Sequence, residues 1–185
     1  MKLNHFTLKN LIKEILLEQE KEKSDKIKEY ERKCNEGDLK ACMKLGIAYD
    51  HGERGAEEND QKAHALYKKA CHGGNMRGCD FLGMDYFFGT VTADNEQRDE
   101  NKNYRLAEKY FTKSCESGRP FGCMQLGSVY EEGGYGVPQD LKKAEAIQRH
   151  ACLVGKHKYS DGDPTPLGDE CAEKGYPEGG FEGEG

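Results

Sequence analysis

The sequence contains no tryptophan, and only 35% of its 185 residues are hydrophobic while 34% are charged. Such a composition provides little material for one thick core, so a thin core spread along a repeat array fits it better than a globule does. Long apolar runs are also missing, because the most apolar segment, 11–17, is interrupted by Lys13 and Glu14. A membrane-spanning helix needs about 20 consecutive apolar residues, so we expect no membrane insertion.

An excess of positive charge is equally absent. The formal net charge is -6 and the sequence pI is about 5.6. Nucleic-acid binding depends on concentrated Lys and Arg, so we expect no nucleic-acid partner. The first six residues lack the apolar core and the small-residue cleavage site that are typical of a secretory signal.

Cysteine, in contrast, is abundant and regularly spaced. Cys34, Cys71, Cys115 and Cys152 are separated by 37, 44 and 37 residues, and an aromatic residue stands four positions before each of the first three. This spacing places the aromatic residue and the cysteine on one face of a helix. A glycine follows three positions after the same cysteines, where a left-handed residue typically ends a helix. These glycines are Gly37, Gly74 and Gly118.

A second pattern, Cys-x-x-Leu-Gly-x-x-Tyr-x-x-Gly, begins at Cys42, Cys79 and Cys123 and has helical spacing. Its central glycine costs up to about 1 kcal/mol relative to Ala, which is tolerable where another helix approaches closely. Together the two patterns predict helix-turn-helix units at 38–71, 75–115 and 119–152, preceded by a helix that ends near Lys33. The additional residues of the second unit lie in 90–102, which we interpret as a surface insertion. The predicted helix starts are Asp38, Asn59, Asn75, Asn103, Asp140 and the pair Arg119-Pro120.

This arrangement resembles the Sel1-like repeat family, and within it the cysteine-rich branch typified by the Helicobacter cysteine-rich proteins. The resemblance covers about residues 26–155 and rests on the Leu-Gly-x-x-Tyr motifs, the Gly-Tyr-Gly-Val-Pro-Gln-Asp-Leu-Lys-Lys-Ala segment at 134–144 and three Cys-x7-Cys pairs. It implies an all-α, right-handed α/α solenoid of Sel1/tetratricopeptide-like helical hairpins. We therefore divide the chain into an N-terminal helix and capping half-unit (1–34), a repeat solenoid with a degenerate last unit (35–174) and a Gly-rich acidic tail (175–185).

Within this resemblance the cysteines have two interpretations, disulfides or metal ligands. Each Cys-x7-Cys pair straddles a turn between helices, which suits the Cα separation of a disulfide, whereas one pair per repeat does not converge on a zinc ion. The fourth pair is open, because position 160 is a serine, so Cys152 either pairs with Cys171 or both thiols are free. The expected disulfide cysteines are Cys34, Cys42, Cys71, Cys79, Cys115, Cys123, Cys152 and Cys171.

A metal alternative remains at the last cysteines, where His150 and His157 accompany Cys152 and Cys171. Disulfides imply an oxidising compartment, periplasmic or extracellular, although the sequence shows no signal peptide. Either the chain is trimmed, or it reaches that compartment by another route, or the thiols stay reduced and act as small core hydrophobes. We expect no bound metal and no cofactor.

Two functions follow from the resemblance, an adaptor that binds a protein or peptide, and a penicillin-binding protein with weak β-lactam hydrolysis. The sequence lacks Gly-x-Ser-x-Gly, Ser-x-x-Lys and His-Glu-x-x-His motifs, so we name no catalytic residue and favour a monomeric adaptor. By analogy with tetratricopeptide repeats, the first helix of each unit lines a groove, although its methionines can instead pack against the adjacent helix. The predicted groove residues are Lys40, Met43, Ile47, Asp50, Arg77, Asp80, Met84, Phe87, Phe121, Met124, Ser128 and Glu131.

The N-terminal segment carries an apolar helical stripe followed by the charged run 18–28. We interpret it as a helix that caps the first hairpin. It also resembles the short leader helices that direct proteins into phage proheads, which is the alternative. The stripe consists of Leu8, Leu11, Ile12, Ile15 and Leu16.

Overall fold

A computed structural model describes residues 5–53, 55–90, 103–134, 136–155 and 171. Within these ranges the chain forms helices and no strand, and it divides into two compact units, Met1–Gly73 and Gly74–Gly185. The all-α class that the sequence predicts is therefore correct. The predicted insertion at 90–102 lies outside the described residues except for Thr90, as does the whole tail at 175–185. The domain boundaries drawn from the sequence stay a prediction.

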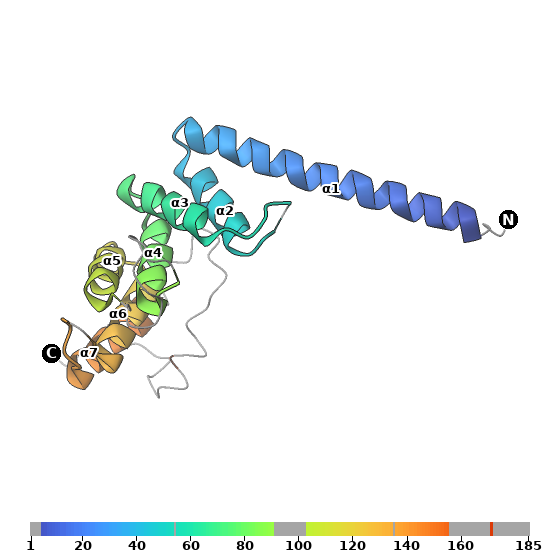
Figure 1. The fold of residues 1–185 in the computed structure, drawn as a ribbon. Helices are drawn as coiled ribbons and strands as arrows, with labels where there is room; N and C mark the ends of the chain where they lie inside the picture. The colour runs from blue at the N-terminus through green and yellow to red at the C-terminus, as the bar shows by residue number, and fades with distance from the viewer. Residues whose placement is uncertain (1–4, 54, 91–102, 135, 156–170, 172–185) are drawn as a thin grey trace. The chain divides into compact units, whose positions relative to one another are not determined.

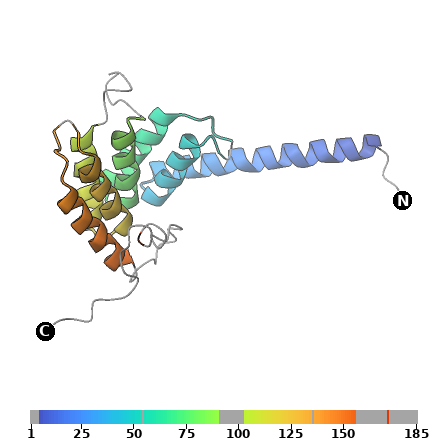
Figure 2. The same ribbon diagram turned by 90° about the horizontal axis from the view of Figure 1, so that it is seen from below.

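The first unit contains α1 (His5–Asn35), α2 (Leu39–Asp50) and α3 (Asp60–His72), with α2 packed against both α1 and α3. The C-terminal part of α1 joins the core, where Ile27 is buried with Leu45, Ala48 and Ala56. Figure 1 and Figure 2 show α1, in blue, extending well past α2 and α3. The apolar stripe that we expect to cap the first hairpin has exposed side chains at Leu11, Ile12, Ile15 and Leu16. The side chain of Leu8 is not described.

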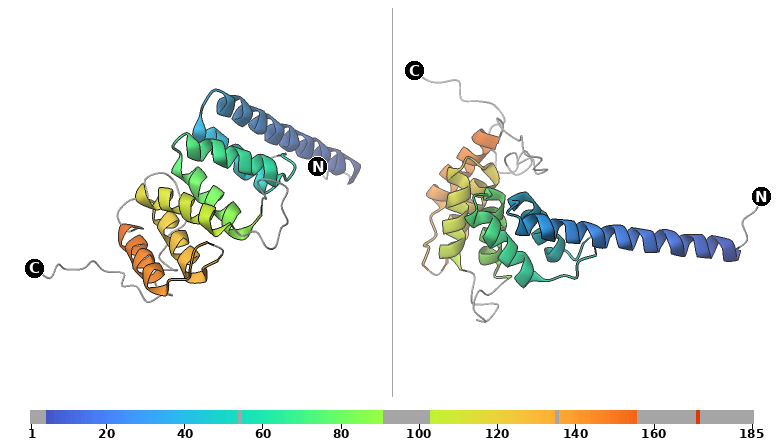
Figure 3. Two further views of the ribbon diagram at one scale, coloured as in Figure 1. Left: turned by 60° about the vertical axis from the view of Figure 1, so that its left-hand side comes forward. Right: turned by 90° about the horizontal axis from the view of Figure 1, so that it is seen from above.

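The second unit contains four helices, each packed against the next along the chain. Their colours run from green to orange in Figure 3. They are α4 (Met76–Phe88), α5 (Tyr104–Glu116), α6 (Pro120–Glu132) and α7 (Leu141–Gly155). The predicted helical hairpins thus form where the cysteine spacing placed them. No helix among the described residues has the length and apolar character that crossing a bilayer requires.

Side-chain caps define most helix starts, because the first backbone N–H groups of a helix have no partner within it. The Asp38 carboxylate accepts hydrogen bonds from the N–H groups of Lys40 and Ala41, at 2.9 and 3.1 Å. Asn59, Asn75, Asn103 and Asp140 cap the next starts through their side-chain oxygens. The exception is Arg119, which makes no capping bond and is followed by Pro120 at the first helical position.

The glycines inside α2, α4 and α6 mark the contact with the following helix. A Cβ on Gly46 would lie 2.6 Å from the Tyr67 ring, and one on Gly83 would lie 2.6 Å from the Phe111 ring. Both rings are buried and occupy the aromatic position four residues before a cysteine. The predicted close approach at the mid-helix glycines is confirmed. The turn glycines that follow the cysteines, Gly37, Gly74 and Gly118, have the predicted positive φ, at 97°, 100° and 84°.

Candidate functional site

Two disulfides of identical spacing join the end of one helix to the start of the next. Cys34 at the end of α1 bonds Cys42 in α2, with Cα atoms 4.6 Å apart, and Cys115 at the end of α5 bonds Cys123 in α6, with Cα atoms 4.4 Å apart. The Gly-containing turn between the helices brings the two Cβ atoms into disulfide range. Closing a loop of about nine residues stabilises the fold by about 2–3 kcal/mol on the loop-entropy account.

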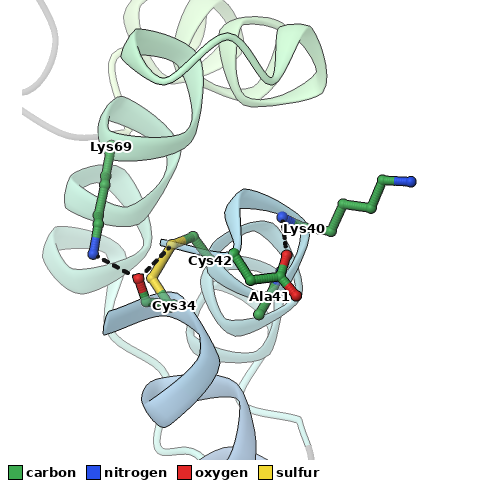
Figure 4. Close-up of a disulfide and its surroundings, with 6 residues drawn as sticks. Cys34, Lys40, Ala41, Cys42 and Lys69 are labelled. Carbon is green, nitrogen blue, oxygen red and sulfur yellow. Dashed lines mark hydrogen bonds between the residues drawn. A yellow bond between two sulfur atoms is a disulfide. The ribbon is translucent and has the colours of Figure 1, made fainter. Parts of the chain in front are cut away.

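A side chain from a third helix reaches the end of α1 beside the first disulfide. Lys69 of α3 donates a hydrogen bond from its Nζ to the carbonyl oxygen of Cys34 at 2.9 Å, as Figure 4 shows. The Cys42 Sγ lies 3.6 Å from the same oxygen, but a disulfide sulfur carries no proton and this is a contact only. Lys69 therefore ties α3 to the junction of α1 and α2.

The remaining cysteines are also disulfide-bonded, and no described cysteine is free. Cys152 bonds Cys171 with a Cα separation of 5.8 Å, which answers the question that Ser160 leaves open in the sequence. Both are buried in a cluster with Cys123, Met124 and Ala151. Because the two sulfurs are bonded to each other, they are not thiolates that could bind zinc, and His157 lies outside the described residues.

Four of the residues predicted to line the groove are buried, so the predicted lining is wrong at these four positions. Met43, Asp80 and Met124 occupy the same repeat position, immediately after a cysteine, and each is no more than 3% exposed. Phe87 is likewise buried, with its ring edge-on to those of Tyr104 and Phe111. For Met43 and Met124 the alternative of an inward-packed side chain holds, and Met124 packs against Ala151 and Cys152. Side chains pointing inward at these positions cannot contact a partner.

Asp80 is buried in a polar network of its own. Its carboxylate accepts a hydrogen bond from the hydroxyl of Ser114 in α5, and another at 2.8 Å from Nε of Arg119 at the start of α6. Arg119 keeps 22% of its side chain exposed while Asp80 is 2% exposed. The network joins α4 to both sides of the turn between α5 and α6, which is a structural role.

The other eight predicted groove residues reach the surface at least in part. Asp50 accepts a hydrogen bond from the Tyr67 hydroxyl at 3.2 Å, and Ser128 donates to the Met124 carbonyl. Glu131 accepts one from Gln148 at 3.0 Å. Lys40 and Glu131 are exposed, whereas the rest of these residues are half-buried: Ile47, Asp50, Arg77, Met84, Phe121 and Ser128.

The residues of α2, α4 and α6 that reach the surface recur at positions n, n+4, n+7 and n+11, where n is the second residue of the helix. On α4 they are Arg77, Phe81, Met84 and Phe88, which we call the α4 stripe. Arg77 lies over the Phe81 ring, with its guanidinium carbon 5.9 Å from the ring centroid, and Phe88 is 52% exposed. The sequence prediction missed Phe81 and Phe88, because the tetratricopeptide analogy placed the lining at n+3 and n+10.

The same positions on the other first helices carry different chemistry. On α6 they are aromatic only at the start and otherwise polar, and on α2 they are largely basic. The α4 stripe is therefore the most apolar of the three. The equivalent residues are Phe121, Gln125, Ser128 and Glu132 on α6, and Lys40, Lys44 and Ile47 on α2 together with His51, the residue that caps its C-terminus.

The tyrosines of the Leu-Gly-x-x-Tyr motifs serve packing. Tyr49 donates a hydrogen bond to Glu31 at 3.0 Å, and Tyr130 donates one to Glu108. Burial, together with the neighbouring carboxylate, raises the pKa of both phenols above the ordinary value of tyrosine. These two hydroxyls thus stay protonated donors, which join α2 to α1 and α6 to α5.

The sequence pattern of the Sel1 repeat family matches residues 39–75, 77–118 and 120–146. Among solved structures, the chain is similar to a Sel1 repeat protein from Oxalobacter formigenes, with a TM-score of 0.55 and 26% identity over 68% of this chain and 47% of that one. It also shares the fold of c5321, a protective antigen present in uropathogenic Escherichia coli strains and displaying an SLR fold, with a TM-score of 0.59 and 20% identity over 74% of this chain and 29% of that one.

The chain spans less than half the length of either solved relative. No curated protein matches it. The comparisons confirm the predicted all-α solenoid class, while the cysteine-rich Helicobacter branch stays a prediction.

Proposed function

Because the chain belongs to the Sel1 repeat family, we propose that it is a disulfide-stapled scaffold that binds a protein or peptide partner. The observation that carries this proposal is the α4 stripe, where three large apolar side chains and one arginine lie in a row on one helix face. Aromatic residues, Met and Arg are the types enriched in the energetically dominant parts of protein interfaces. Repeat scaffolds use surfaces of this kind to hold extended ligands.

A rigid helix presents the stripe. Leu82 and Phe87, on the opposite side of α4, are buried, and Cys79 in its first turn is disulfide-bonded. Anchoring of this kind reduces the conformational entropy that a binding surface loses when a partner docks. The chemistry favours a peptide with apolar anchors spaced by one helical turn and a carboxylate that reaches Arg77.

The binding experiment uses peptides selected from a random phage-displayed library on the immobilised, oxidised full-length chain. Isothermal titration calorimetry then compares wild type with the Phe81→Glu/Met84→Glu variant. Loss of two anchors is expected to weaken binding by at least about thirtyfold, the equivalent of about 2 kcal/mol. Far-ultraviolet circular dichroism checks that the variant keeps its helices.

A matched control exists in the next repeat. Gln125→Glu with Ser128→Glu introduces the same charges at the same helical positions of α6, where the wild-type residues are polar. This control is expected to bind within about twofold of wild type if the α4 stripe carries the affinity. Equal losses in both variants, or a selection that yields no peptide, would reject the proposal.

The β-lactam alternative stays a prediction of the family resemblance. No observation among the described residues favours it, because the polar side chains that lie close together, such as Asp80, Ser114 and Arg119, are engaged in the fold. Turnover of the chromogenic cephalosporin nitrocefin by the oxidised chain tests it directly. Hydrolysis above the buffer rate would revive the enzyme alternative.

A further inference from the structure

The N-terminal half of α1 carries an apolar face that is exposed along its length. Every side chain from position 9 to position 19 is exposed, whereas Ile27, further along the helix, is buried in the core. In Figure 2 this half of α1, in darker blue, extends away from α2 and α3. Contiguous exposed apolar side chains on a folded chain mark an interaction site. The residues of this face, which we call the α1 face, are 45–53% exposed and comprise Leu11, Ile12, Ile15 and Leu16.

The charges around the α1 face favour a protein surface over a lipid surface. Between positions 9 and 19, Lys9 and Lys13 are balanced by Glu14 and Glu18, so this segment has no net positive charge. Helices that lie on anionic membranes are usually rich in Lys and Arg on their polar side. An apolar surface on another helix is therefore the better complement to the α1 face.

The α4 stripe has a shape and length that match the α1 face. The α1 face consists of two rows spaced by four residues, Leu11–Ile15 and Ile12–Leu16, with a groove between them. The α4 stripe is a single row of large side chains, and helices associate by packing the ridge of one into the groove of another. At 1.5 Å per residue, the stripe at 77–88 is about 17 Å long and the α1 segment at 9–18 is about 14 Å long.

Charge selects the direction in which two such helices run. Lys9 flanks the N-terminal end of the α1 face and Glu18 flanks its C-terminal end, each two helical turns from an apolar residue of the face. Antiparallel packing brings Glu18 to Arg77 at the start of the α4 stripe. It also brings Lys9 to the exposed Phe88 ring at the other end, where a cation is attracted to the ring face. Parallel packing would instead place Lys9 beside Arg77, which is a like-charge contact.

We propose that the α1 face of one copy of this chain docks, antiparallel, on the α4 stripe of a second copy. The inference rests on the proposed function, because it uses the same stripe and names a partner for it. Each copy carries one docking helix and one docking surface, so association increases with protein concentration. The docked helix occupies the surface that a peptide takes, so self-association and peptide binding compete.

Sedimentation velocity of the oxidised full-length chain, over a range of micromolar concentrations, tests the proposal. The weight-average mass of the wild type is expected to rise with concentration. Leu11→Glu/Ile15→Glu removes the docking helix and Phe81→Glu/Met84→Glu removes the docking surface, so each variant alone is expected to associate at least about thirtyfold more weakly. An equimolar mixture of the two variants is expected to associate, because it contains one intact helix and one intact surface.

A matched control lies on the opposite side of α1. Asn10→Glu/Leu17→Glu adds the same charge at two exposed positions that lie about 180° around the helix axis from the α1 face. This control is expected to associate within about twofold of wild type. Far-ultraviolet circular dichroism checks that every variant keeps its helices.

Each alternative occupant of the α1 face gives a different result. Association that survives Phe81→Glu/Met84→Glu would assign α1 to the α1 of another copy and overturn the proposal. Association that survives Leu11→Glu/Ile15→Glu would pair two α4 stripes and overturn it as well. A wild type that stays monomeric at every concentration also contradicts it. If that monomer binds vesicles of phosphatidylcholine and phosphatidylglycerol, the α1 face is assigned to lipid.

Failure of this inference is distinguishable from failure of the proposed function. Leu11→Glu/Ile15→Glu leaves the α4 stripe intact, so this variant is expected to bind a selected peptide at least as tightly as wild type. Peptide binding by this variant, together with a monomeric wild type, would reject self-association alone. A self-associating wild type that selects no peptide would reject the peptide-binding function and leave the contact between copies standing.

Discussion

At equivalent buried positions, the second repeat carries polar side chains and the third repeat carries apolar ones. In the second repeat the residue after the cysteine is Asp80, which faces Ser114, whereas the equivalent residues of the third repeat are Met124 and Ala151, packed in an apolar cluster. Each pair is consistent within itself, since a buried carboxylate needs donors and a buried thioether needs apolar neighbours. The repeat therefore constrains the pair of residues and not either residue alone.

The largest effect is expected when the polar residue is placed in the apolar layer. Met124→Asp would bury a carboxylate among Cys123, Ala151 and Cys152, at a cost of about 3–5 kcal/mol in the free energy of unfolding. Urea titration of the oxidised chain, followed by circular dichroism, measures this change. A loss below about 1 kcal/mol would show that the layer in the third repeat accommodates charge.

The reverse substitution is expected to cost less, because Arg119 can turn to water. Asp80→Met removes the acceptor of the buried Ser114 hydroxyl and destabilises the fold by about 2–3 kcal/mol. Adding Ser114→Ala restores the pairing of the third repeat, so at least about 1 kcal/mol of the loss returns. A double-mutant cycle from urea titrations gives the coupling free energy between positions 80 and 114. Strictly additive losses would contradict the view that the repeat constrains this pair of residues.

The smallest effect concerns the mid-helix glycines of the same two repeats. Gly83→Ala meets the buried Phe111 ring and is expected to cost about 1–3 kcal/mol through overpacking. Gly127→Ala meets the Cγ of Gln148, which is buried but unbranched and can adopt another rotamer. The gain of about 1 kcal/mol in helix propensity therefore offsets part of the overpacking and of the lost hydrogen bond to Glu131, and the net cost is expected to be smaller than that of Gly83→Ala. Thermal unfolding compares the two, and equal shifts in Tm would contradict this distinction.

The helices could be predicted because their signals are local and repeated. Cysteine spacing, turn glycines and caps such as Asp38 depend on neighbours a few residues away, and the structure places them as expected. The pairing of Cys152 with Cys171 could not be predicted in the same way, because Cys171 departs from the spacing of the earlier pairs. Its partner depends on a long connection and not on helical periodicity.

The surface was harder to predict than the core. The analogy with tetratricopeptide repeats selected n+3, where Met43, Asp80 and Met124 prove to be buried, and passed over n+4, where Phe81 lies. Adjacent positions on a helix differ by about 100° around its axis, so a shift of one residue exchanges interior for surface. The burial of Asp80, a charged residue, is explained by the hydrogen bonds that Ser114 and Arg119 donate to its carboxylate.

Methyl NMR of the methionines tests the central claim, that the chain binds peptides through the α4 stripe, most directly. Met84 lies in the stripe, whereas Met43 and Met124 are buried and serve as internal controls. With selectively labelled methyl groups, addition of a selected peptide is expected to shift the Met84 resonance at the calorimetric Kd and to leave those of Met43 and Met124 nearly unchanged. A peptide that binds without moving the Met84 resonance would contradict the account.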